Sequence, residues 1–475
     1  MIEFFWRIPC DNNYNKITHM KKLQILLIAG AAAFHFACNP LEVKELVDPN
    51  NPSESSVLNN ATRRQVQFLV TGLEQRHRGY VTNISQAWNT FGRETWYLNA
   101  SDPRFQTDWL GQAGRVPDAA YFGFGATGGG SYATPYQCIK QGYVLIDAAN
   151  NSGELSAQEK RAVAGFAKTI MAYQFMIPAN WQYENGIRTD VKDPLKPGGF
   201  RSYTAAMGFV DSLLNAGYDD LNNGGTTFPF TLTAGFTGFN TIDGLKRVNR
   251  AIAARCAVYR KDWQGALTAL NLSFMNLTGA LGAGPAHTFG APPDAFNPLF
   301  YVLDANINTI IVVHPSVLAD ATPGDARVAA KFHQRATPVT ITTDAMPLVG
   351  THQDKRWASN TSPIPFIKNE ELILIKAEAH AQLNQTTDAV NAINIIRNAA
   401  NIGNYGGATT QAALINEILY QRRYSLWAEP WGHRWIDARR YDRLNTIPTS
   451  FDQGTIFKQF PRPQSEINWD LYAGG

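Results

Sequence analysis

Cysteine is scarce in this 475-residue sequence, and its spacing indicates no chemistry. There is no CxxC pair and no Cys/His cluster of the kind that binds zinc or forms a redox centre. The four cysteines are Cys10, Cys38, Cys138 and Cys256. Cys256 falls on an apolar helical line, which predicts a buried free thiol; a disulfide with Cys138 is the alternative in an oxidising compartment. We expect no metal and no cofactor.

Charged residues are also few, at 17% of the chain, and their signs nearly cancel to a formal net charge of +3 at pH 7. Residues 1–37 hold four Lys/Arg and two Asp/Glu, so the remaining chain is close to neutral. No basic patch or stripe stands out along the sequence. This composition argues against a polyanion-binding surface and therefore against a nucleic-acid partner.

Common catalytic motifs are missing as well, since the sequence holds no nucleophile elbow, no HExxH and no P-loop. Residues 123–128 match G-x-G-x-x-G without a strand before or a helix after them, so we interpret them as a flexible or tightly turned loop. A glycosidase would need two facing carboxylates, which a sequence alone cannot pair. Several C-terminal glutamates lie near arginines and are expected to form structural ion pairs: Glu371, Glu378, Glu417 and Glu429, with Arg422, Arg423, Arg434 or Arg439.

Arginines cluster again around Trp435, at Arg434, Arg439 and Arg440. Such a cluster fits either an anion site or an architectural role, and we favour the architectural role.

One long apolar run interrupts this polar background, close to the N-terminus. Residues 20–38 read MKKLQILLIAGAAAFHFAC, with Lys21 and Lys22 before an apolar stretch shorter than a membrane span. We predict a signal peptide over residues 1–37, with 1–19 an over-extended start and Met20 the true one. Cys38 follows small Ala37, which predicts lipidation at Cys38; ordinary signal cleavage and an uncleaved anchor are the alternatives. Residues 38–60 are then a lipidated tether rich in Pro, Asn and Ser.

Helical periodicity dominates the rest, in segments near 62–80, 156–275 and 369–440. Thr387 and Thr410 are predicted to cap the second and third of three helices in 369–440, and Pro178 and Gly217 to end two earlier ones. The inward faces recur at spacings of three and four: Val66, Leu69 and Leu73; Ala162, Phe166, Ile170, Tyr173 and Ile177; Tyr203, Ala206, Val210 and Leu213; Leu372, Ile375, Ala379 and Leu383. The segment from Leu245 to Tyr259 pairs with residues 263–270 in the same design. This repetition predicts about four tetratricopeptide-like helical hairpins that form a right-handed scaffold.

Two regions, near 85–135 and 279–365, lack this period and are predicted to be loop-rich, with short strands such as TIIVV and PVTITTD in the second. The first is dense in aromatic residues among Arg, Asn and Gly. Aromatic faces stack on sugar rings, and loops on a rigid helical frame commonly carry binding groups. Although most such rings fill a core, we predict ligand-binding candidates here and in the second region: Trp88, Arg93, Trp96, Tyr97, Asn99 and Trp357.

Three segments of the C-terminal third carry distinctive patterns: ELILIKAEAHAQLN, QRRYSLWAEPWGHRWIDARR and the ending FPRPQSEINWD. Together they resemble the SusD/RagB family of outer-membrane nutrient-binding lipoproteins, with departures from the family pattern at Gln421, Ser425 and Pro430-Trp431. This resemblance implies a single domain over residues 61–475. It also implies that the protein binds a nutrient, a glycan or else a peptide, and delivers it to a SusC-like TonB-dependent transporter while held at the outer membrane by its lipid. It implies no enzymatic activity.

Two other classes stay open from the residues themselves. A secreted carbohydrate-active enzyme would place two carboxylates face to face in a cleft. A purely structural scaffold would bury Trp88, Trp96 and Trp357 and leave no groove lined with aromatic rings.

Overall fold

The computed structural model describes residues 58–117, 119, 131–306 and 308–473, which belong to one compact unit of residues 55–475. The signal segment, Cys38 and the glycine run at 123–128 lie outside the described residues. No helix in the described part of the chain is long and apolar enough to cross a membrane.

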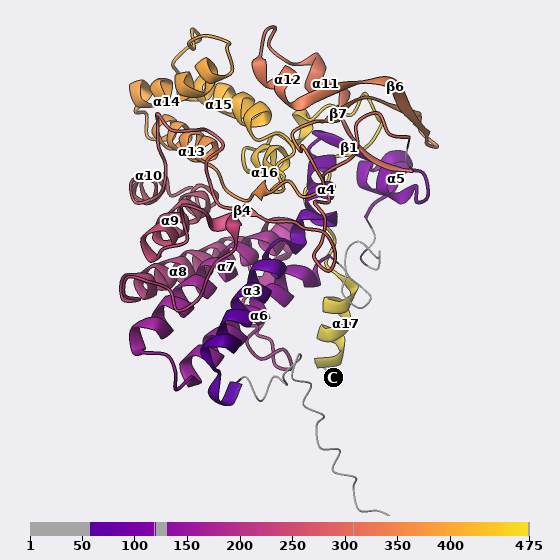
Figure 1. Ribbon diagram of the computed structural model, residues 1–475. Coiled ribbons are helices and arrows are strands. Elements are labelled where there is room, and N and C mark those ends of the chain that lie inside the picture. Colours follow the sequence, from indigo (N-terminus) through magenta and orange to yellow (C-terminus); the bar gives the residue numbers. More distant parts are fainter. Residues whose placement is uncertain (1–57, 118, 120–130, 307, 474–475) are drawn as a thin grey trace, which may run out of the picture. The chain divides into compact units, whose positions relative to one another are not determined.

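In the part of the chain that the structure describes, nine helices pack consecutively into a layered stack, which Figure 1 shows rising from α3 at its base to α14 and α15. They pair as α3 with α6, α7 with α8, α9 with α10 and α13 with α14, and α15 closes the series on α13 and α14. This arrangement confirms the predicted set of about four hairpins. Their bounds are α3 Arg63–His77, α6 Ala133–Asn151, α7 Ala157–Gln182, α8 Tyr203–Asn222, α9 Ile242–Tyr259, α10 Trp263–Asn271, α13 Asn369–Gln382, α14 Thr386–Ala399 and α15 Gln411–Ser425.

Local capping signals explain several of these starts. Thr62 and Gln65 form a reciprocal capping box at the start of α3, and the Thr410 side chain accepts from Ala413 N at the start of α15, as predicted. The prediction for Thr387 was wrong, because α14 begins at Thr386, with Gln385 at the cap position and no side-chain cap, so Thr387 lies inside the helix.

Neither Pro178 nor Gly217 ends its helix, contrary to prediction. Every residue of α7 from Thr169 to Gln182 is buried, and packing on both sides holds the helix together across Pro178. Gly217 lies where α8 crosses α7, since a Cβ at the facing Gly165 would come within 2.9 Å of the Gly217 carbonyl oxygen. This glycine permits close helix packing rather than termination.

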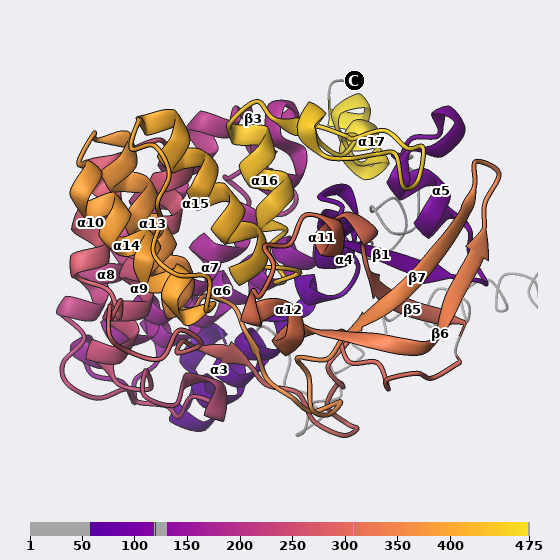
Figure 2. The same cartoon turned by 90° about the horizontal axis from the view of Figure 1, so that it is seen from above.

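The non-helical regions build a second layer beside the stack, at the end away from α10 and α14 (Figure 2). Its core is an antiparallel sheet of order β1-β5-β7-β6, and the bounds are β1 Thr95–Asn99, β5 Thr309–Val313, β6 Phe332–Thr342 and β7 Pro347–Asp354. The helices of this layer and of the C-terminal segment are α4 Asn83–Phe91, α5 Arg104–Leu110, α11 Pro315–Ala319, α12 Ala326–Lys331, α16 His433–Arg440 and α17 Gln464–Ala473. Two small ribbons pair β2 Ile187–Arg188 with β3 Phe200–Arg201 and β4 Ala286–His287 with β8 Ile364–Pro365. Short 3-10 turns span Gly79–Val81, Gln112–Gly114, Tyr183–Asn185, Ala234–Phe236 and Leu444–Thr446.

The aromatic-rich region is therefore more regular than predicted. Residues Ile84 to Phe91 of α4 are all buried, so its apolar face (Ile84, Ala87, Trp88 and Phe91) and its polar face both lie inside the protein. The strand-like TIIVV segment is β5, and PVTITTD largely coincides with the second half of β6, which confirms that part of the prediction.

Both described cysteines are free and buried, as predicted for Cys256, so no disulfide joins them. The Cys138 thiol lies 3.9 Å from the Leu73 carbonyl oxygen and the Cys256 thiol 3.6 Å from that of Met207. Burial raises the pKa of both thiols, so they are unreactive small apolar side chains.

A buried ion pair joins the two halves of the helical stack. The Arg255 guanidinium on α9 donates to Glu371 on α13 at 2.6 and 2.5 Å, and to the Phe366 carbonyl oxygen at 3.0 Å. It also stacks over the Trp431 ring, 4.3 Å from its centroid. Arg255 and Glu371 are each 2% exposed, so the pair lies in the interior at the centre of the stack.

We expect Arg255→Met to lower the free energy of unfolding by about 3–5 kcal/mol, because it leaves Glu371 buried without its partner. The double variant Arg255→Met/Glu371→Gln should lose less than the single one. Lys246→Ala, which removes an exposed pair with Asp243 on the same helix, should cost no more than about 1 kcal/mol. Chemical denaturation measures all three, and a single variant no weaker than Lys246→Ala would contradict the central role of the pair.

A buried histidine makes the fold sensitive to acid. Burial lowers the pKa of His77 on α3 to about 3, and its ring accepts a hydrogen bond from Gln174 Nε2 at 2.8 Å through Nδ1. Below the ordinary histidine pKa of about 6.5, the unfolded chain therefore takes up a proton that the folded chain does not. Stability present above pH 6.5 is lost as the pH falls towards 3.

We expect His77→Phe to flatten this loss. The slope of unfolding free energy against pH between 6.5 and 4 should fall by up to about 1.4 kcal/mol per pH unit, the contribution of one proton. Urea unfolding at several pH values measures the slope. An unchanged slope would show that His77 does not titrate on unfolding.

Candidate functional site

The structure buries three of the six predicted binding residues, which corrects the prediction. Trp88 and Arg93 are 0% and Trp96 is 2% exposed. Arg93 pairs with Asp452 at 2.7 Å, and Trp96 Nε1 donates to the same carboxylate at 3.4 Å. Trp88 packs edge-on against Trp431. Large rings gain most from burial, so these side chains support the layer beside the stack and offer no surface to a ligand.

Tyr97 and Asn99 lie on the same strand as Trp96 but are only half-buried. Tyr97 packs edge-on against Phe105 and its hydroxyl is hydrogen-bonded to that of Tyr301, a residue the sequence analysis did not select. Asn99 Oδ1 accepts from the backbone of Ser101 at 2.9 Å. Among the residues the structure describes, the Asn99 amide nitrogen has no hydrogen-bond partner and can donate to a ligand.

The loops that carry Tyr301 and Trp357 are joined directly. Asn297 N donates to the Asn360 carbonyl oxygen at 2.7 Å, and Asn297 Nδ2 donates to that of Ser362 at 2.9 Å. Four ring and amide side chains thus lie on one strand and two neighbouring loops. We call Tyr97, Asn99, Tyr301 and Trp357 the ring face.

Trp357 is held firmly at this position. The Arg356 guanidinium lies 5.0 Å from the centroid of its ring and is fixed by hydrogen bonds to Asp354 at 2.7 Å and to the Trp427 carbonyl oxygen at 2.8 Å. The tryptophan is half-buried. A ring fixed in this way loses little conformational entropy when a ligand stacks on it.

The loop of Tyr301 also exposes apolar side chains, which indicates contact with something other than water. Phe296 is 45%, Val302 60% and Leu303 39% exposed. Single exposed apolar residues are ordinary, but a group in one loop beside partly exposed rings marks an interaction site. Their sequence signal is weak, because an aromatic in an irregular loop looks the same whether it is buried or exposed.

A ring-lined groove of about 350 Å³ lies apart from the ring face, between α6, residues 188–197 and α17. Tyr136 and Trp469 line it together with Lys140. Arg188 also lines it and is neutralised by Glu466 at 2.8 Å and by Asp470. The prediction overlooked Trp469, which stands in the family-like ending of the chain. The groove falsifies the expectation of a scaffold without an aromatic groove.

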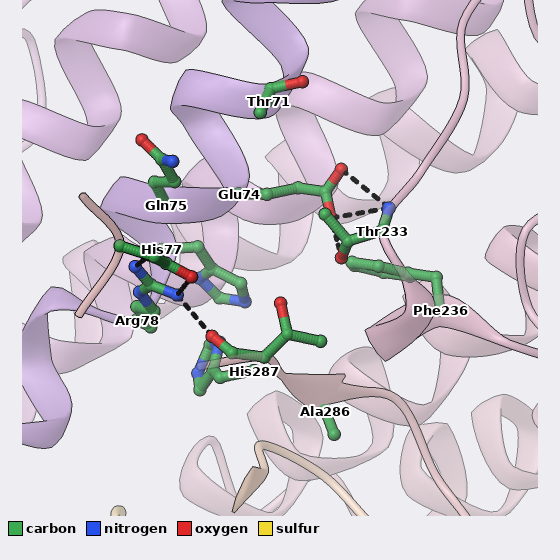
Figure 3. A pocket seen from close by; sticks show the side chains of 11 residues that line it. Thr71, Glu74, Gln75, His77, Arg78, Thr233, Phe236, Ala286 and His287 are labelled. Carbon is green, nitrogen blue, oxygen red and sulfur yellow. Dashed lines mark hydrogen bonds and ion pairs between the residues drawn. The ribbon is translucent and has the colours of Figure 1, made fainter. Parts of the chain in front are cut away.

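Another cavity, shown in Figure 3, is a small polar pit of about 70 Å³ between α3, the Thr233 loop and β4. Glu74 points towards Thr233 and accepts from its backbone N at 3.1 Å, while Arg78 reaches the Thr288 carbonyl oxygen. Burial raises the pKa of Glu74. The volume has room for a few water molecules and lies well below that of ligand pockets.

The predicted structural role of the C-terminal glutamates is confirmed, although with other partners than expected. Glu371 pairs with Arg255, Glu378 with Arg440, Glu417 with Arg397 and Glu429 with Lys368. The described residues contain no group of three His, Cys, Asp or Glu that could hold a metal ion.

Comparison with known proteins agrees with this architecture. Residues 339–470 match the family model described as the SusD family. No curated protein matches the sequence. Among solved structures, a laminarin-binding SusD-like protein has a TM-score of 0.61 at 12% identity, covering 85% of this chain and 97% of that one. Surface glycan-binding protein A from Bacteroides uniformis has a TM-score of 0.60 at 11% identity, with 86% and 98% covered. A SusD superfamily protein from Bacteroides vulgatus has a TM-score of 0.60 at 14% identity, with 86% and 97% covered.

The fold thus defines a mainly helical protein of tetratricopeptide-like hairpins with a sheet-bearing layer beside them. The match over residues 339–470 adds a more specific finding: this part of the chain matches the SusD family, whose solved structures share the fold.

Proposed function

We propose that this protein is a cell-surface lipoprotein that binds a nutrient glycan through the ring face and delivers it to a SusC-like TonB-dependent transporter. The match to the SusD family supports a binding protein rather than an enzyme. The observation that carries the ligand class is the ring face itself. Three partly exposed rings and a free amide donor lie beside an exposed apolar loop, the chemistry that a sugar ring requires.

The known relatives favour a glycan over a peptide, because two of the similar structures are named as laminarin-binding and surface glycan-binding. A peptide ligand of the same face is the alternative. Isothermal titration against laminarin oligosaccharides, other neutral glycans and a peptide panel separates the two, and reducing-sugar release under the same conditions would reveal an enzyme instead.

Removing either of two partly exposed rings of the ring face, Trp357 or Tyr301, should weaken glycan binding without unfolding the protein. We expect Trp357→Ala and Tyr301→Ala each to reduce affinity about tenfold, about 1.4 kcal/mol. Phe68→Ala is the control, because it removes a ring on α3 that is 56% exposed and does not belong to the ring face. It should leave the glycan affinity unchanged. If Trp469→Ala abolishes binding while the two ring-face variants do not, the groove at α17 is the glycan site.

Attachment to the outer membrane through Cys38 is the second part of this proposal, supported by the MKKLQILLIAGAAAFHFAC segment. We expect Cys38→Ala to move the protein from the membrane fraction to the soluble fraction while its glycan affinity is retained. Mass spectrometry of the wild-type protein should find an acylated Cys38 at the mature N-terminus. Co-purification of a TonB-dependent transporter with the wild-type protein tests the delivery step, and an unmodified Cys38 would refute the anchor.

A further inference from the structure

A cavity of about 440 Å³ lies outside the ring face, between α11, α15, α16 and residues 443–451. Three guanidinium groups line it, from Arg423, Arg434 and Arg443, together with the carboxylates of Asp320 and Asp437. We call this cavity the arginine pocket. Its volume falls within the range of small-molecule sites.

The two carboxylates are already neutralised by other contacts. Asp437 binds Arg422 at 2.5 Å and Arg440 at 2.9 Å, and Asp320 binds Arg423 at 2.7 Å. Neither forms an ion pair with Arg434 or Arg443. The pocket is positively charged despite its acidic residues.

Arg434 is the strongest sign of a missing anion. Its Nη1 donates to the Arg93 carbonyl oxygen at 2.8 Å, and no carboxylate of the described residues lies within salt-bridge distance of it. Burial, followed by the neighbouring Arg423 charge, lowers the pKa of Arg434 to about 9. Arg434 is half-buried, and a partly desolvated cation that touches no carboxylate is costly, so a bound anion would offset part of that cost.

Arg423 also presents an unused donor. Its Nη1 and Nη2 are bound to Asp320 and to Ser316 Oγ at 3.0 Å, whereas Nε is buried with no hydrogen-bond partner among the described residues. The side chain is only 10% exposed. Buried polar groups are nearly always hydrogen-bonded, so this donor indicates a ligand or water in the pocket.

Glu94 and Asp320 act on Arg434 through space rather than by contact. Glu94 is fully buried, and that burial raises its pKa against the opposing charges of Arg434, Arg423 and Arg356. Burial therefore disfavours the charged form of the carboxylate closest in effect to Arg434.

The other walls of the pocket are apolar or aromatic. Leu419, Ile447, Pro448, Phe451 and the ring of Tyr420 face it. The Tyr420 ring is fixed because its hydroxyl donates to the Asp320 carbonyl oxygen at 3.1 Å and accepts from Thr322 N at 2.8 Å. Guanidinium groups match planar oxyanions, and the rings match the C–H face of a sugar.

We propose that the arginine pocket binds a sugar unit that bears an oxyanion, a carboxylate or a sulfate, through Arg434, Arg443 and Arg423 Nε. The choice of a sugar as the carrier rests on the glycan-binding role proposed above. The oxyanion itself is held by Arg434 and Arg443, whose guanidinium groups have no carboxylate partner in the part of the chain that the structure describes.

The test titrates the full-length protein at pH 7 with D-glucuronate, D-glucose 6-sulfate, D-glucose and inorganic sulfate. We expect one of the two acidic sugars to bind at least about tenfold more tightly than glucose and than inorganic sulfate. Arg443→Ala, at the rim, should weaken that binding about tenfold, and Arg434→Gln should do the same from inside. Arg247→Ala removes an exposed charge on α9, outside the pocket lining, and serves as the matched control, which should not change the affinity.

Two results would overturn the proposal: acidic sugars that bind no more tightly than glucose, or an affinity for the acidic sugar that Arg443→Ala leaves unchanged. Inorganic sulfate that binds as tightly as either sugar would overturn the sugar assignment. Thermal unfolding of each variant separates lost binding from lost folding. Neutral oligosaccharides report on the ring face independently, because Trp357→Ala should weaken their binding about tenfold and leave that of the acidic sugar unchanged.

Discussion

The ion pair between Arg255 and Glu371 is the constraint on which the arrangement of the two halves depends. It joins α9 to α13 across more than a hundred residues of intervening chain, and its guanidinium also contacts Trp431 and the Phe366 carbonyl oxygen. Charged groups removed from water need geometrically good partners, and here the partner comes from the other half of the stack. The pair therefore fixes where the segment between residues 272 and 368 leaves and re-enters the helical stack, and with it the position of the sheet-bearing layer.

The sheet-bearing layer carries the ring face. The stack buries Trp88, Trp96 and Arg93 at its contact with the layer, and Asp452, from the chain after α16, closes the cluster. With these large groups held inside, Tyr97 on the next position of β1 points to the opposite side of the strand and meets Tyr301. Rigid support behind a few partly exposed rings is what a stacking surface needs, because a mobile ring loses entropy on binding.

The sequence predicted the helices well and the ring positions poorly, for the same physical reason. Helices such as α8 and α14 have one apolar and one polar face over fourteen residues or more, so their period is visible. The helix α4 has only nine residues, and β1 alternates only over five, so neither period extends far enough to stand out. Over such short spans, Trp88 and Tyr97 look alike in the sequence, although one is in the core and the other near the surface. Pro178 and Gly217 misled the boundaries because packing between α7 and α8 outweighs local propensity.

The arginines of the C-terminal segment show the same division between support and surface. Arg439 is committed to the carbonyl oxygens of Asn180 and Lys458, and Arg440 to Glu378, so the architectural role expected for the cluster holds for these two. Arg434 stands on the same short helix but has only a backbone carbonyl as partner. A helix whose other guanidinium groups are all satisfied by the fold would not leave one unmatched for stability, since an apolar side chain of similar length would fill the space at lower cost. This exception supports a ligand-binding role for Arg434 rather than a role in stabilising the fold.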